Sequence, residues 1–232
     1  MKEVVINEKN YLLPQNWDEV TFEQFTRIVK LQKDLSGNEH DMIVVAKLSA
    51  AILNIHVTDL YLLPLSNFTM LSEILEFVFA TEPKANNVKD SYCIGSTLVY
   101  VDKDLRKYTA GTMLSYLIST QNMDDENDKA RYATAIMLRE DKSLEFNAEK
   151  YAHHANMVYG MNIQDMMGLS AFFLNTQTNF MEKNTKNYSE ATKQAQEELE
   201  QTPLKDGGGT DHSKNSQWAI LLNTPQSTEK IG

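Results

Sequence analysis

The feature that most constrains the fold is a strong helix-start signal near the N-terminus, within residues 17–31. Thr21 is followed three positions later by Gln24, which is the spacing of a capping box, where each side chain bonds the backbone N–H of the other residue. Val20 before the cap and Phe25 after it are placed to pack together as a hydrophobic staple. Apolar side chains then recur at helical spacing, at Phe22, Phe25, Ile28, Leu31 and Leu35. One face of this helix must be buried against the rest of the protein.

Helical spacing of apolar side chains returns along most of the first 178 residues. It predicts helices over 40–55, 68–79 and 130–138, a short helix over 58–63 capped by Thr58, and three more that open at Thr109, Asn147 and Asn162. Asp165 stands at the box position after Asn162. In the helix after Thr109, the face predicted to be buried consists of Met113, Leu114, Leu117 and Ile118.

Two segments instead show the β-branched and aromatic composition of strands. Residues 4–13 place two apolar runs around a polar turn, and residues 92–101 do the same around Gly95-Ser96. Both are predicted to be hairpins. The predicted fold class is therefore mainly α-helical (α+β with two short β-hairpins), with a compact helical domain and an extended C-terminal arm.

The character of the chain changes after residue 178. We predict a helical body with short hairpins over 1–178, and a polar helix, a glycine-rich linker and a C-terminal docking arm over 179–232. The polar helix has only a thin apolar stripe, which is typical of a solvent-bridging or partner-binding helix. The linker is Gly207-Gly208-Gly209. The candidate partner-binding residues lie beyond it, at Trp218, Ile220, Leu221 and Leu222, and dock on this protein's own body or on a partner.

Charge and composition exclude several classes of function. The chain has 22 Lys and Arg against 32 Asp and Glu, a formal charge of −10, which disfavours direct nucleic-acid binding. A basic partner surface suits this charge better, although acidity also serves solubility. We expect no membrane span and no signal peptide, and therefore a protein that is cytosolic or assembled in a cytosol. Cys93 is the only cysteine, and its place in a predicted strand indicates a buried structural thiol.

No residue pattern indicates catalysis, a metal site or a cofactor site. The acidic segment 124–128 alternates carboxylates as a calcium loop does, but Lys129 stands where that loop needs glycine. His153 and His154 are adjacent, so their side chains diverge on a helix and cannot chelate one metal ion together. Gly207-Gly208-Gly209 is not followed by the Gly-Lys-Ser/Thr of a phosphate loop. We predict a protein that is not an enzyme and that binds no cofactor and no metal.

One longer pattern resembles a known group of proteins. Residues 14–25 read Pro-x-x-Trp-x-x-Val-Thr-x-x-Gln-Phe, which is similar to the opening of small tail-assembly and virion-associated proteins of tailed phages, especially phages of Bacteroidota-type hosts. Further similar segments follow in the same order and end near residue 175: 94–101, 105 with 109–111, 135–139, 146–151 and 163–174 with its Phe172-Phe173 pair. Each segment alone is weak, because it consists of a helix cap and core residues.

The resemblance implies a non-enzymatic structural or assembly protein of a phage tail or neck, acting through protein–protein packing. Its expected partners are other tail or neck proteins, and copies of itself in a ring, and its expected location is the virion or the host cytoplasm during assembly. One alternative is a tail assembly chaperone that is absent from the mature particle. Another, from a different class, is a soluble acidic adaptor that binds a host protein.

Overall fold

The computed structural model describes residues 1–35, 39–142, 145–179 and 190. Apart from residue 190, these belong to one compact unit, Met1–Lys183. The predicted fold class is confirmed, because this unit is mainly α-helical and carries two small antiparallel sheets. The predicted linker and the candidate residues Trp218, Ile220, Leu221 and Leu222 lie outside the described residues.

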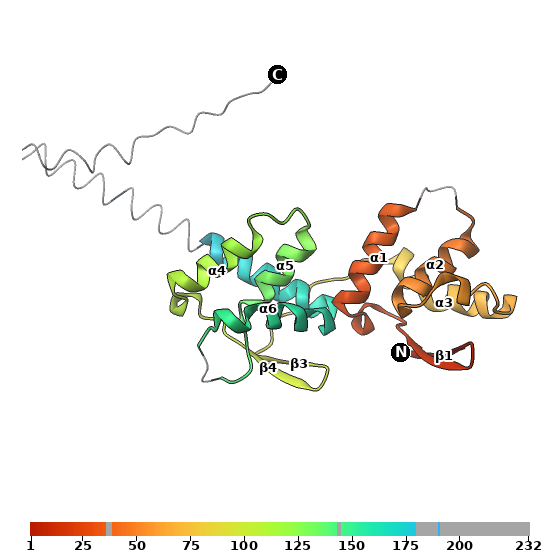
Figure 1. Cartoon of the computed structure of the whole chain (residues 1–232), viewed down its shortest axis with the longest axis horizontal. Coiled ribbons are helices and arrows are strands. Elements are labelled where there is room, and N and C mark those ends of the chain that lie inside the picture. The colour runs from red at the N-terminus through yellow and green to blue at the C-terminus, as the bar shows by residue number, and fades with distance from the viewer. Residues whose placement is uncertain (36–38, 143–144, 180–189, 191–232) are drawn as a thin grey trace, which may run out of the picture. The chain divides into compact units, whose positions relative to one another are not determined.

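The first part of the unit is a hairpin followed by three helices (Figure 1). Strands β1 (Lys2–Ile6) and β2 (Lys9–Leu13) pair around Asn7 and Glu8. Both turn residues have positive φ, 48° and 66°, as two-residue hairpin turns with the twist of the strands require. The helices are α1 (Phe22–Asp34), α2 (Asp41–Leu53) and α3 (Leu65–Ala80), with α2 packed against both of the other helices and against β2.

The predicted capping box is present at the start of α1. The Gln24 backbone N–H donates to Thr21 Oγ1 at 3.2 Å, and the Thr21 backbone N–H donates to Gln24 Oε1 at 3.0 Å. The short helix predicted over 58–63 is wrong in length and in its cap. Only a 3₁₀ turn forms, η2 (Val57–Asp59), and its N-cap is His56. Pro64 follows this turn and stands at the N-cap of α3, where a proline is tolerated because a backbone N–H at a helix start has no partner within the helix.

The second part of the unit contains a three-stranded sheet and four helices. Strands β3 (Ser91–Ile94) and β4 (Thr97–Val101) form the second predicted hairpin. The helices are α4 (Ala110–Thr120), α5 (Glu126–Ala135), α6 (Ala148–Met157) and one over 163–179. Thr109 and Asn147 cap α4 and α6 as predicted. Asp125 caps α5, so the acidic segment 124–128 contains the start of this helix.

Two predictions about the sheet region are wrong. The helix predicted over 130–138 ends at Ala135, and the chain then turns into strand β5 (Leu138–Arg139), which pairs with β4. Cys93 is exposed rather than buried. Strand residues alternate between two faces, and in β3 the neighbouring Tyr92 and Ile94 take the buried face, which leaves Cys93 outside.

The two parts are joined where the residues before α1 meet the residues before the 163–179 helix. The backbone N–H of Phe22 donates to the carbonyl of Met161 at 2.8 Å, and that of Ile163 donates to the carbonyl of Val20 at 3.0 Å. Asn162 Nδ2 lies within 2.8–3.2 Å of the carbonyl oxygens of residues 17, 18 and 20. Asn162 Oδ1 accepts from the backbone N–H groups of residues 164 and 165, which is the N-cap predicted from the sequence.

The connecting segment 81–90 is held on the 163–179 helix. The backbone N–H of Asn86 donates to the Gln164 carbonyl at 2.9 Å, and a Cβ added at Gly168 would lie 2.1 Å from the Asn86 carbonyl oxygen. Only glycine allows this close approach. Asp165 receives hydrogen bonds here from Asn86 Nδ2, at 2.9 Å, and Lys89 Nζ, at 3.1 Å. Its side chain therefore fixes a distant segment.

Substituting Asn162 by Asp tests whether its donor group joins the two parts. The introduced carboxylate would still cap the helix, but it has no N–H to give to the three carbonyls and would repel them. We expect a loss of about 2 kcal/mol in the free energy of unfolding, measured by urea denaturation. Asn147→Asp is the matched control, because Asn147 only accepts hydrogen bonds at its cap, and a change below about 0.5 kcal/mol is expected. Equal effects at the two sites would contradict this role of Asn162.

Candidate functional site

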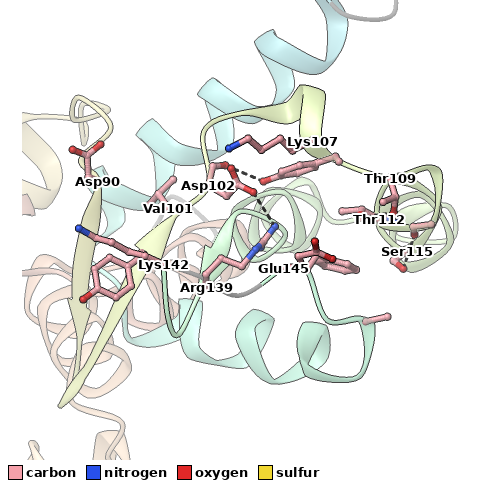
Figure 2. A pocket seen from close by; sticks show the side chains of 15 residues that line it. Asp90, Val101, Asp102, Lys107, Thr109, Thr112, Ser115, Arg139, Lys142 and Glu145 are labelled. Carbon is pink, nitrogen blue, oxygen red and sulfur yellow. Dashed lines mark hydrogen bonds and ion pairs between the residues drawn. The ribbon is translucent and has the colours of Figure 1, made fainter.

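A large open cleft lies between the start of α4, strand β4 and the segment before α6 (Figure 2). Its volume is about 1150 Å³. Three cations and three carboxylates line it, so the cleft as a whole has no net charge; they are Lys107, Arg139, Lys142, Asp90, Asp102 and Glu145. This balance gives no preference for an anionic or a cationic ligand.

Arg139 is buried beside the cleft and is held by the protein itself. Its Nη1 donates to the carbonyls of Ile136 and Leu138 at 2.7 and 2.8 Å, and its Nη2 lies 3.5 Å from Asp102 Oδ2. The rings of Tyr108 and Phe146 each lie 5.6 Å from the guanidinium carbon. These partners stabilise the buried charge and hold Nη1 and Nη2 within the fold, whereas Nε is buried without a hydrogen-bond partner among the described residues.

Several other polar groups of the cleft also have partners within the protein. Burial raises the pKa of Tyr108, so its hydroxyl stays protonated and donates to the Asp102 carbonyl at 3.0 Å. Thr109 Oγ1 accepts from the Thr112 backbone N–H, and Ser115 Oγ donates to the Gly111 carbonyl. A hydrogen bond from Lys103 lowers the pKa of Asp90 and keeps it ionised. The described lining has no histidine and no cysteine.

A smaller cavity, which shares Arg139 with the cleft, is lined partly by His154. His154 is buried, whereas the adjacent His153 is exposed, so the two diverge as predicted for neighbours on a helix. His154 Nε2 lies 3.5 Å from Glu140 Oε1, and Lys150 Nζ also binds Glu140. Burial lowers the pKa of His154 and outweighs the opposing attraction of Glu140.

The lowered pKa of His154 predicts a loss of stability at acid pH. The unfolded chain binds the proton more readily than the folded protein, so the free energy of unfolding falls as the pH drops below the ordinary histidine value of about 6.5. His154→Gln should reduce this slope in urea titrations between pH 7 and pH 5. His153→Gln is the control and should leave the slope unchanged. An equal slope in all three proteins would contradict the assignment.

The part of the chain that the structure describes contains neither a metal-binding cluster nor a membrane-spanning helix. No three His, Cys, Asp or Glu side chains there are grouped so that they could hold a metal ion. None of the described helices is both long enough and apolar enough to cross a membrane.

The face of α4 that was predicted to be buried is largely exposed. Leu114, Leu117 and Ile118 are 53%, 48% and 64% exposed, and Met113 is half-buried. The buried face instead consists of Thr112, Tyr116 and Thr120. The Tyr116 ring packs edge-on against Phe173 at 5.0 Å, and the Thr120 hydroxyl donates to the Tyr116 carbonyl within the helix, so it can be buried without an unpaired donor.

We call Leu114, Leu117 and Ile118 the α4 face. These side chains stand at positions i, i+3 and i+4, so they lie on one side of the helix. No residue of α4 is charged. A solvated helix normally carries charged side chains opposite its buried face, so this composition is typical of a helix with a partner on each side. An absence of charge over eleven residues is the sequence signal that could have identified this surface.

A second apolar surface is formed by the chain segment that connects α2 to α3 and by the first residue of α3. We call it the corner patch, formed by Tyr61, Leu62 and Leu65, which are 54%, 81% and 67% exposed. Beside it is a groove of about 330 Å³, lined partly by Met42, Leu65 and Phe68. The corner patch and the α4 face are the two candidate interaction surfaces of the described unit.

Comparison with known proteins gives no relative from which a function could be transferred. No protein-family model, no curated protein and no solved structure matches this chain at a significant level. The functional conclusion therefore depends on the sequence and on the surfaces described above.

Proposed function

We propose that this chain is a non-enzymatic structural or assembly protein of a phage tail or neck, acting through protein–protein packing. The observation that carries the proposal is the α4 face, where large aliphatic side chains are exposed on a helix without charge. Exposed apolar surface of this kind marks interaction sites in folded proteins. In the cleft of about 1150 Å³, the side chains of Arg139, Tyr108 and Asp90 have partners within the protein, which favours a packing role over catalysis.

The resemblance to phage tail-assembly and virion-associated proteins supplies the biological setting. Its two most extended segments, 14–25 and 163–174, meet at Asn162, where side-chain and backbone hydrogen bonds join them. The fold needs both segments to form this junction. The presence of both segments in this chain therefore favours an architecture shared with the phage proteins that it resembles. The virion, or the host cytoplasm during assembly, is the proposed location.

Removal of residues 203–232 tests the proposed docking arm. We expect the truncated chain to keep the helical circular dichroism and the unfolding midpoint of the full chain, because unit Met1–Lys183 has its own core. Incorporation into particles should fall by about tenfold or more, as expected when an interface loses its buried anchors. Replacing Trp218, Ile220, Leu221 and Leu222 by Ser in the full chain separates the apolar patch from the length of the arm, and should give the same loss. An unfolded body or undiminished incorporation would refute the arm.

A further inference from the structure

The α4 face is bordered by opposite charges at its two ends. Lys107 is exposed just before α4, next to Arg106, whose guanidinium is paired with Asp104. Asp124 is exposed just after α4, next to Asp125, whose carboxylate caps α5. Lys107 and Asp125 lie equally far along the chain from Tyr116, which is near the middle of the helix. The surface is therefore uncharged in the centre, basic where the helix begins and acidic after it ends.

We propose that α4 packs antiparallel against α4 of a second copy of this chain, so that the two form a two-fold symmetric dimer. An antiparallel arrangement places the beginning of each helix beside the end of the other, which brings the basic segment of one copy to the acidic segment of its partner. The helix dipoles also oppose each other favourably. The aliphatic side chains of the α4 face then pack across the two-fold axis.

Charge distribution favours a second copy over a different partner. Each copy has a formal charge of −10, so two copies repel over most of their surfaces and can meet best where charge is absent or complementary. The α4 face with its bordering residues meets both conditions with its own copy. A strongly basic partner would instead gain most from acidic surface, which the α4 face lacks. Isologous pairing through one patch is also the commonest way in which soluble proteins form dimers.

This inference shares with the proposed function the premise that the α4 face is an interface, and it names the partner of that face. The contact centres on one helix of eleven residues, so the interface is small and its dissociation constant should lie in the micromolar range, about 1–100 μM. Sedimentation velocity of the full chain over a concentration series through this range measures it directly. We expect a monomer–dimer equilibrium.

Substitutions on and away from the α4 face locate the contact. Leu117→Lys and Ile118→Lys each place a like charge on both sides of the two-fold axis, and each should raise the dissociation constant by about tenfold or more. Both side chains are exposed, so circular dichroism should stay unchanged. Leu62→Lys, in the corner patch, is the matched control and should leave the equilibrium as it is. A full chain that stays monomeric, or a dimer that neither α4 variant weakens, would overturn the proposal.

A charge exchange tests the antiparallel arrangement. Lys107→Glu and Asp124→Lys should each weaken the dimer, because each places like charges together. The double variant should restore it, since each copy then meets an exchanged partner. Weakening without restoration would overturn the antiparallel pairing. A monomer would overturn the dimer alone and leave a role in phage assembly intact, whereas a dimer that is absent from particles would count against the phage role alone.

Discussion

Replacing Trp17 by Ala should lower the free energy of unfolding by about 3–5 kcal/mol. Trp17 is only 7% exposed. Its ring meets Phe77 and Phe25 edge-on at 5.0 and 6.1 Å, so the change removes a large aromatic contact area and leaves a cavity. Its Nε1 also donates to the carbonyl and the hydroxyl oxygens of Thr81, both at 3.1 Å.

Two further variants separate the contributions of Trp17. Trp17→Phe keeps an aromatic ring but removes the donor to Thr81, and should cost about 1–3 kcal/mol. Tyr61→Ala removes an exposed aromatic ring and should stay within about 0.5 kcal/mol of the original chain. Urea denaturation followed by circular dichroism measures all three. A loss below about 1 kcal/mol for Trp17→Ala would show that this ring does not hold the start of α1 against α3.

Replacing Arg139 by Met should cost about 3 kcal/mol or more in the free energy of unfolding. The apolar side chain fills a similar volume, but the carbonyls of Ile136 and Leu138 lose their donor, and Asp102 loses its buried cation. These bonds hold the turn between α5 and β5, so the three-stranded sheet should lose its third strand first. Hydrogen exchange at residues 136–139 should accelerate more than exchange in α1.

Comparison with a second cation of the same cleft makes this test specific. Lys142 is exposed, with its Nζ 5.1 Å from the centre of the Tyr100 ring, and Lys142→Met should change stability by no more than about 1 kcal/mol. Arg139→Lys should recover only part of the loss, because one ammonium group cannot match the planar fork that bonds two carbonyls and lies beside two rings. Full recovery with Lys would contradict the role assigned to the guanidinium.

The features that could be predicted from the sequence are local. A cap needs only a suitable side chain and the next three residues, so the predictions for Thr21, Thr109, Asn147 and Asn162 are all confirmed. Hairpins with strong turn residues are also local. Contacts between residues far apart in the sequence could not be predicted. Asn162 and Trp17, for example, are too widely separated for any local sequence pattern to indicate that they meet. The same reason explains why the sequence pattern predicts a helix where strand β5 forms, since this strand exists only through pairing with β4.

The orientation of elements was harder to predict than their existence. In α4, two stripes compete for the core, and hydrophobicity alone favours Leu114, Leu117 and Ile118 over the Thr-Tyr-Thr stripe that is buried. The outcome depends on Phe173, which comes from a distant helix. Strand β3 presents the same difficulty, because alternation predicts two faces without saying which one Cys93 takes. The polar cleft beside Arg139 has no local signature either, since its lining comes from separate segments.

Peptide mass spectrometry of purified particles tests most directly the proposal that this protein builds phage particles by packing against other proteins. Particles and infected-cell lysate from the source of the chain should be compared. We predict stoichiometric peptides of this chain in the particle. Peptides found only in the lysate, together with an unassembled tail protein, would make it an assembly chaperone instead. Absence from both the particles and the assembly complexes of the lysate would contradict the account.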